Sequence, residues 1–305
     1  MKSAERSLTE EYLDYLDSVR GLSVATRLAY SHDLSSWEDF LATQNSDPLR
    51  ASRREASGFL TRLGKSGLAA SSVNRTLSCL RGFYRFLQKT GRKSEHPLTG
   101  IRGLKRSRHL PPFLFEQEVL KILETPAAQG FQGLRDRTLF EFLYATGCRV
   151  AELCSLRLDD VELFSEEKEG GQIRVLGKGH KQRTIFLTAS AAAALKAYLP
   201  ERALRLDPAD SQAAAKLFLN ARGKALGVRG VAKILARALR ASSLSKHVSP
   251  HTFRHTFATH LLNEGMDVRV VQELLGHSRL ETTQIYTHLD LDRLRDVVRH
   301  SHPHG

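Results

Sequence analysis

The fold of this chain is most constrained by a stripe of apolar residues at helical spacing that lies opposite a stripe of basic residues. The apolar stripe consists of Val73, Leu77, Leu80, Tyr84 and Leu87. The basic stripe follows steps of four, four and three and consists of Arg81, Arg85, Lys89 and Arg92. Side chains at these steps share one face of an α-helix. The pattern therefore predicts a helix that buries one face in a helical domain and offers a basic face to a phosphate backbone.

Basic residues are concentrated around this helix. Residues 50–108 hold 15 Lys/Arg and 2 Asp/Glu, whereas residues 1–49 hold 4 Lys/Arg and 9 Asp/Glu. Such a block repels itself unless an anion lies against it, which favours nucleic acid as a partner over the alternative of a merely solvated surface. The residues that we expect to contact DNA are Arg75, Arg81, Arg85, Lys89, Arg92, Lys105 and Arg106.

Length and turn-forming residues divide the chain into domains. Its 305 residues exceed the usual size of one domain. A first helix near residues 8–20 ends at Gly21, and Ser23 caps the next. After Gly91, the segment 92–112 is rich in basic residues, glycine and proline, which is typical of a linker. We expect a helical domain over residues 1–91, a basic linker over 92–112 and a second domain over 113–305.

The second domain combines helices with a short β-segment. One apolar helix is predicted from Asp136 to Thr146, and another begins after Gly147. The β-rich runs 172–176 and 182–187 flank a glycine-containing turn, which predicts a hairpin. Residues 189–216 are predicted as a helix, a proline-containing turn and another helix. The predicted fold class is mainly α with a small antiparallel sheet.

Composition also indicates the compartment. The chain contains no long apolar run that could cross a bilayer, and its N-terminus has no export signal. The three cysteines, Cys79, Cys148 and Cys154, cannot all be paired and have no metal-ligand spacing. We therefore expect a cytoplasmic protein with no membrane partner.

A candidate phosphate-binding arginine follows Gly147, which breaks one helix and opens another. Arg149 is expected in the first helical turn, where unpaired backbone N–H groups and the helix dipole favour an anion. Glu152, one turn later, is placed to hold the arginine side chain by an ion pair. Taken alone, an Arg and a Glu three residues apart are usually an ordinary surface pair.

Lys178 is a candidate proton donor at the tip of the predicted hairpin, between Gly177 and Gly179. A lysine in such a turn can enter a DNA groove and deliver a proton if nearby cations lower its pKa. The alternative is an ordinary basic hairpin tip, and the turn taken by itself favours that alternative.

A second cluster of polar candidates begins at Ser249. His251 and Arg254 share one helical face, while Phe253, Phe257 and Leu261 repeat at steps of four and anchor the helix in the core. His251 and His255 also have the spacing of zinc ligands. The zinc-protease pattern requires Glu at the position that Thr252 occupies, and cysteines are not clustered, so no metal is expected.

The last candidates lie near the C-terminus. Val268, Val271, Leu274 and Leu275 predict a buried helix that stops at Gly276, and His277 follows. Ser278 and Glu281 form a capping box for the next helix, which carries Tyr286 about two turns from its start. Because a lone helical tyrosine is more often packing than a nucleophile, this pattern leaves its role open.

Six residues occur together in the order of a known family: Arg149, Lys178, His251, Arg254, His277 and Tyr286. The phrases around them are TGCRVAELCSLRLDDV, VLGKGHKQRTIFL, PHTFRHTFATHLL and VQELLGHSRLETTQIYTHL. With these phrases the chain resembles the tyrosine site-specific recombinases of the Xer type. Its first helices, LTEEYLDYLDSVRGLSVATRLAYSHDLSSWEDFL, look like the core-binding domain of that family. The resemblance covers both domains and is weakest over residues 189–216 and at the His-rich end.

The resemblance implies a SAM-like helical core-binding domain and a mixed α/β catalytic domain that close as a C-shaped clamp around DNA. It implies that Tyr286 attacks the scissile phosphate and forms a 3′-phosphotyrosine link, with no metal or other cofactor. It assigns phosphate binding to Arg149 and Arg254 and general-acid catalysis to Lys178. It gives assisting roles to His251 and His277, and Glu152 supports Arg149.

The resemblance also implies partners. They are a dif-like DNA site, a tetramer assembled with itself or with a paralogous Xer recombinase through a C-terminal helix at about 289–300, and an FtsK-like DNA translocase that acts during chromosome-dimer resolution. The alternatives that remain open are a mobile-element integrase, a relaxing topoisomerase of type IB, and a DNA-binding protein without catalysis.

Overall fold

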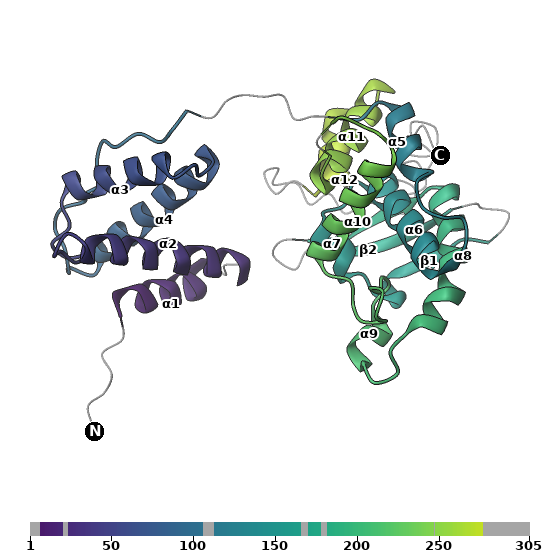
Figure 1. Ribbon diagram of the computed structural model, residues 1–305, viewed down its shortest axis with the longest axis horizontal. Helices are drawn as coiled ribbons and strands as arrows, with labels where there is room; N and C mark the ends of the chain where they lie inside the picture. Colours follow the sequence, from purple (N-terminus) through teal and green to yellow (C-terminus); the bar gives the residue numbers. More distant parts are fainter. Residues whose placement is uncertain are drawn as a thin grey trace. The chain divides into compact units, whose positions relative to one another are not determined.

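The computed structural model describes residues 7–20, 24–105, 113–165, 170–177, 182–246 and 248–276. The chain divides into two compact units, Met1–His109 and Leu110–Gly305 (Figure 1). Lys178, His277, Tyr286, Arg106 and the proposed helix at 289–300 lie outside the described residues. Among the residues that are described, no helix is both long enough and apolar enough to cross a membrane.

The described part of the first unit consists of four helices: α1 Leu8–Arg20, α2 Val24–Ala42, α3 Arg53–Lys65 and α4 Ala70–Lys89. A capping box between Ser52 and Glu55 starts α3. All five residues of the predicted apolar stripe on α4 are buried, so that prediction is confirmed. Trp37 of α2 donates a hydrogen bond to the Tyr84 hydroxyl of α4 over 3.0 Å, and both side chains are fully buried.

The chain after α4 stays bound to the first unit. Leu98 is buried in its core, and Arg81 donates a hydrogen bond to the carbonyl of Ile101. The Asn74 amide donates to the carbonyl of Leu104 (2.9 Å) and accepts from its N–H (2.8 Å). Residues 92–104, which composition indicates as linker, therefore lie along α4.

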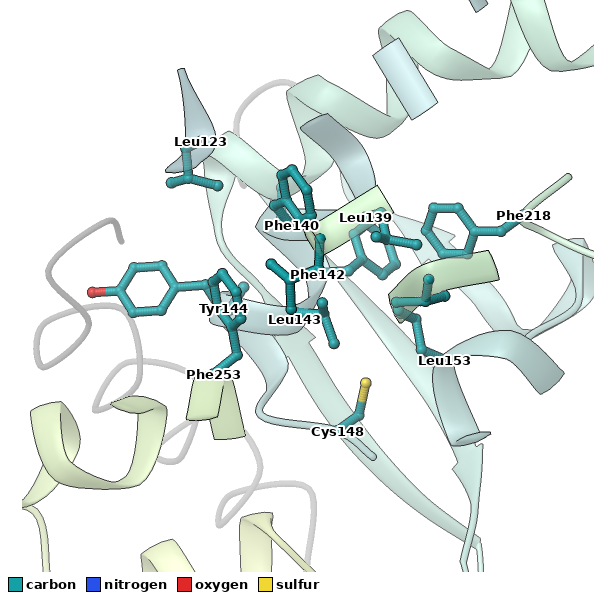
Figure 2. Packing of buried hydrophobic residues seen from close by; sticks show 14 of the residues in the cluster. Leu123, Leu139, Phe140, Phe142, Leu143, Tyr144, Cys148, Leu153, Phe218 and Phe253 are labelled. Carbon is teal, nitrogen blue, oxygen red and sulfur yellow. The ribbon is translucent and has the colours of Figure 1, made fainter. Parts of the chain in front are cut away.

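The second unit is built around the 17-residue helix α6 Gly130–Thr146. Consecutive apolar residues give α6 apolar side chains on every face, which is typical of a fully buried helix. Figure 2 shows Phe140, Phe142 and Leu143 of α6 among apolar side chains of other elements. Phe140 stacks on Phe253 with 6.3 Å between ring centroids, and Phe142 meets Phe218 edge-on at 5.6 Å. The helix begins at Gly130, six residues before the predicted start at Asp136. The prediction missed the first turns because they carry few apolar residues.

The other described helices of this unit are α5 Glu116–Leu123, α7 Val150–Ser155, the 3₁₀ turn η1 Leu158–Asp160, α8 Ala189–Arg205, α9 Ser211–Ala215, α10 Val228–Ala241, α11 Pro250–Asn263 and α12 Val268–Leu274. Of these, α5, α7, α8 and α11 pack directly against α6. As predicted, residues 189–216 form two helices around a turn that contains Pro208. Of the residues predicted to be buried in α12, Val268 is exposed, so that part of the prediction is wrong. Val268 is the first residue of the helix, where the chain still faces solvent.

A three-stranded antiparallel sheet completes the second unit, with β1 Val161–Leu163, β2 Gly171–Leu176 and β3 Gln182–Leu187 in the order β1-β2-β3. The pairing of β2 with β3 confirms the predicted hairpin, and β1 was not predicted. Ile173 pairs with Ile185 and Val175 pairs with Arg183. Directly paired residues share a face, so Arg183 lies on the inner, apolar face of the sheet. The predicted fold class, mainly α with a small antiparallel sheet, is confirmed.

Gly147 ends α6 and should be difficult to replace. Its φ is +54°, and an added Cβ would lie 2.4 Å from Cδ1 of Phe257. Gly130, at the other end of α6, has φ of +77° but no atom within 4 Å of its added Cβ. We expect Gly130→Ala to cost about 1–2 kcal/mol for left-handed backbone alone. Gly147→Ala should add about 1–3 kcal/mol for the steric clash. Urea unfolding of both variants checks this difference, and equal losses would contradict it.

Candidate active site

Arg149 is held at the start of α7 by Glu152. Its backbone N–H donates to Oε2 of Glu152 over 2.8 Å, and its Nη1 donates to Oε1 over 2.8 Å. The predicted ion pair is therefore present. Arg149 is the residue that precedes the first turn of α7, not a residue within that turn as predicted, because Gly147 and Cys148 extend the break after α6. The Arg149 side chain is 38% exposed and the Glu152 side chain only 6%.

Arg254 reaches the same place from α11. Ser249 caps this helix and Pro250 begins it, which fixes the direction in which Arg254 leaves the helix. The guanidinium donates to the carbonyl of Gly147 over 2.9 Å and to that of Leu275 over 2.5 Å. Burial, with the nearby charge of Arg149, lowers the pKa of Arg254 to about 10. The side chain still carries its charge at neutral pH.

A third arginine, Arg183 of β3, joins this cluster and was missed by the sequence analysis. Its Nη1 and Nη2 donate to the two oxygens of Glu152 over 3.1 and 2.9 Å, and its Nε donates to the carbonyl of Leu274 over 3.1 Å. Strand alternation was the available signal. It places Arg183 on the same face as Ile185 and Leu187, where a charged side chain needs a buried partner.

The three arginines also fix the end of α12. The carbonyl of Leu274 accepts from Arg183, that of Leu275 from Arg254, and that of Gly276 from Arg149 at 3.3 Å. The last carbonyls of a helix have no intrahelical donor and carry the negative end of its dipole. The positive charges of the arginines therefore stabilise this helix end. They hold residues 274–276, directly before His277 in the sequence.

The charges of the cluster favour an anion. The cluster holds three guanidiniums, two of them bound to Glu152, and one carboxylate. Two positive charges are therefore in excess in a partly buried place. Burial alone would raise the pKa of Glu152, but hydrogen bonds from Arg183 and Arg149 outweigh it and hold the pKa below its ordinary value. The carboxylate is therefore ionised at neutral pH. A phosphate fits the excess charge because guanidinium N–H groups match its oxygens in pairs.

Of the remaining predicted catalytic residues, only His251 lies among the described residues. His251 lies exposed one turn before Arg254 on α11. Because Lys178, His277 and Tyr286 fall outside the described residues, their roles stay predictions. Within the described ranges, no group of three or more His, Cys, Asp or Glu side chains could hold a metal ion.

The predicted DNA-binding residues of the first unit are partly engaged inside it. Arg75 forms an ion pair with Asp33, Arg92 pairs with Glu11 over 2.8 Å, and the Lys89 ammonium lies 5.5 Å from the ring centroid of Tyr15. Arg85 and Lys105 are exposed. Any anion that binds along α4 must therefore compete with some of these internal contacts.

A second basic stripe was not singled out from the sequence and lies on α10. Its buried side carries Val231, Ile234, Leu235 and Ala238. Its exposed side carries Arg229, Lys233, Arg237 and Arg240. These residues follow steps of four, four and three, the same signal that marks α4, so the spacing could have revealed them. Arg237 pairs with the buried Asp136, and the other three cations face solvent.

Comparison with protein families covers both units. Residues 112–293 match the model described as the phage integrase family. Residues 9–91 match the N-terminal SAM-like domain of phage integrases. The SAM-like character predicted for the first domain is thereby confirmed.

Several curated proteins are similar over nearly the whole chain. A tyrosine recombinase XerC from Oceanobacillus iheyensis is 40% identical, covering 96% of this chain and 95% of its own. The XerC of Bacillus subtilis is 37% identical, with 98% and 97% covered. A tyrosine recombinase XerD from Listeria monocytogenes is 40% identical, covering 97% of this chain and 98% of its own.

Solved structures show the same architecture. The XerH site-specific recombinase, in a post-cleavage complex with palindromic difH substrate, has a TM-score of 0.70 and 26% identity, covering 94% of this chain and 83% of its own. A lambda integrase tetramer bound to a Holliday junction has a TM-score of 0.67 and 21% identity, covering 95% and 77%. The second match is a likeness of fold alone.

The ion pairs of Glu152 with Arg149 and Arg183 predict that the fold loses stability as the pH falls. A carboxylate whose folded pKa lies below its ordinary value of 4.5 stabilises the fold above that pH and loses this contribution as the pH falls through the folded pKa. Glu152→Gln should therefore cost about 3 kcal/mol at pH 7, the lower end for a broken buried pair. The difference from the unchanged protein should shrink in acid.

Urea unfolding between pH 7 and pH 3 measures this difference. The matched control is Glu162→Gln on the exposed face of β1, which should change stability by less than about 0.5 kcal/mol. A Glu152→Gln loss that stays constant with pH would contradict the electrostatic origin.

Proposed function

The chain belongs to the phage integrase family as a tyrosine recombinase of the Xer type, and on that premise we propose that Tyr286 attacks a DNA phosphodiester to form a 3′-phosphotyrosyl link. The observation that carries the proposal is the pair Arg149 and Arg254, which reach one place from the start of α7 and from α11, in a cluster that has two positive charges in excess. Their contacts to Gly147, Leu275 and Gly276 are to neutral carbonyls. A phosphate can replace such contacts without breaking an ion pair.

The chemistry follows from where charge develops. When the Tyr286 oxygen attacks, the phosphorus becomes five-coordinate and its non-bridging oxygens gain negative charge. Arg149 and Arg254 stabilise that charge with hydrogen-bond donors that are already oriented. The 5′-oxygen leaves and takes a proton from Lys178 as the general acid. The tyrosyl ester keeps the energy of the broken bond, so a 5′-hydroxyl of another strand reverses the step without ATP.

His251 and His277 assist these steps. His251 lies one turn from Arg254 on the exposed side of α11, which suits proton transfer to or from Tyr286. His277 follows the three carbonyls that the arginines hold, and there it donates a hydrogen bond to the phosphate. Glu152 fixes the direction of Arg149 and does not contact the substrate.

The proposed substrate is double-stranded DNA with a dif-like site. Exchange of strands between two duplexes needs four active sites, which means a tetramer joined through the helix at about 289–300. The solved XerH recombinase, which is bound to difH substrate, supports the DNA part of this proposal. We extend it to chromosome-dimer resolution in the cytoplasm, with a paralogous recombinase or a second copy and an FtsK-like translocase.

Covalent trapping tests the nucleophile. A nicked duplex that carries a dif-like site should give a protein–DNA band on a denaturing gel, and Tyr286→Phe should abolish it because the variant lacks the attacking oxygen. A second tyrosine, exchanged in Tyr15→Phe, is the matched control and should leave the band intact. A band that persists with Tyr286→Phe would show that Tyr286 is not the nucleophile. Relaxation of any supercoiled plasmid without paired sites would favour a topoisomerase.

Salt dependence tests the two basic stripes. Each phosphate contact contributes about 0.9 to the slope of log affinity against log salt concentration. Arg85→Ala on α4 and Lys233→Ala on α10 should each reduce that slope by about this amount. Lys196→Ala, which removes an exposed lysine from α8, should leave it unchanged. An unchanged slope for Arg85→Ala would remove α4 from the proposed DNA interface.

A further inference from the structure

Arg183 carries a charge on a face of the sheet that is otherwise apolar. Its neighbours there are Val175, directly opposite in the register, and Ile185, two residues along the strand, and both are buried. A charge in such a place is costly unless it is paired and hydrogen-bonded. The pairing with both oxygens of Glu152 meets that cost. The paired hydrogen bonds to Glu152 are therefore what stabilises a charged arginine at this position.

The contacts of Arg183 leave its guanidinium little freedom to bind DNA. Its Nε is used by Leu274, and both terminal nitrogens are used by Glu152. Gly276 packs against the guanidinium so closely that an added Cβ would lie 3.0 Å from Nη1. The side chain is only 16% exposed, less than half the value for Arg149. Arg183 is thus placed behind the arginines that can reach a phosphate.

The charge balance gives this position a consequence for the reaction. Glu152 has one negative charge, and Arg149 is its other ion-pair partner. If Arg183 were neutral, that charge would cancel Arg149, and the site would offer one net positive charge to the phosphate. With Arg183 present the carboxylate is already compensated. Arg149 and Arg254 then keep two positive charges for the oxygens that gain charge in the transition state.

We propose that Arg183 is a positioning residue for strand cleavage: it neutralises Glu152 and holds the end of α12, so that Arg149 and Arg254 act on the phosphate with their full charge. This role rests on the proposed function, because it concerns the rate of phosphodiester cleavage. It requires no contact between Arg183 and DNA. The effect of replacing Arg183 should therefore depend on whether Glu152 is charged.

The test is a double-mutant cycle of Arg183→Met and Glu152→Gln, measured by single-turnover formation of the covalent complex on a nicked duplex. Arg183→Met should slow cleavage about a hundredfold, the loss typical of one transition-state charge contact. The double variant should cleave at least about tenfold faster than Arg183→Met, because no carboxylate remains to cancel the charge of Arg149. A merely structural role of Arg183 predicts no such rescue.

Two further variants keep the test decisive. Arg183→Lys retains the charge but loses the paired hydrogen bonds, so its rate should lie between those of the unchanged protein and Arg183→Met. Arg174→Met makes the same substitution on the exposed face of β2 and should leave the rate unchanged. If Arg183→Met fails to fold, the double variant and Arg183→Lys still give the comparison. The double variant has no carboxylate at position 152, and Arg183→Lys keeps a positive charge beside Glu152.

Three results would overturn the proposal. A double variant that is no faster than Arg183→Met would remove the charge argument, and where Arg183→Met does not fold, a double variant more than a hundredfold slower than the unchanged protein would do the same. A salt slope that falls by about 0.9 with Arg183→Met or Arg183→Lys would make Arg183 a direct phosphate contact. The absence of any covalent complex with the unchanged protein would overturn the proposed function itself, and the role of Arg183 with it.

Discussion

The second unit depends on one buried carboxylate, that of Glu152. It holds the backbone and side chain of Arg149 at the start of α7, and it pairs with Arg183 on β3. The same two arginines, with Arg254 of α11, take up the last carbonyls of α12. A helix start, a strand, a second helix and the end of a third therefore meet through charge-assisted hydrogen bonds. Without Glu152, no carboxylate would offset the positive charges of Arg149, Arg183 and Arg254.

The frame around this carboxylate is set by α6. The left-handed backbone at Gly147, which lies against Phe257, turns the chain after α6 and so places Arg149 at the start of α7. Near the same end of the helix, the Tyr144 hydroxyl lies 2.9 Å from Nδ1 of His260, whose Nε2 lies 2.9 Å from the carbonyl of Leu114. Burial lowers the pKa of His260, which favours the neutral ring that such a chain of hydrogen bonds needs. Helix α11, which carries Arg254, is thereby tied to α6 near its C-terminal end.

Local patterns made much of this predictable from the sequence. Helical spacing identified the buried face of α4, and β-rich runs around a glycine turn identified the β2–β3 hairpin. Steps of four identified Phe253, Phe257 and Leu261 as the buried residues of α11. Contacts between distant residues were not predictable in the same way. Arg183 and Glu152 are 31 residues apart and lie on different kinds of element. The three residues of β1 form a strand only because Gly171 to Ile173 lie beside them.

The contacts of the cluster also explain which arginine a phosphate would engage first. Arg183 spends its nitrogens on a carboxylate and a carbonyl and is nearly enclosed. Arg149 shares the carboxylate through Nη1 but gives Nη2 only to the carbonyl of Gly276, across 3.3 Å. A long bond to a neutral acceptor costs least to exchange for a charged one, since the new bond is about twice as strong. Arg149 is therefore the arginine that a phosphate can engage with the smallest loss of existing contacts.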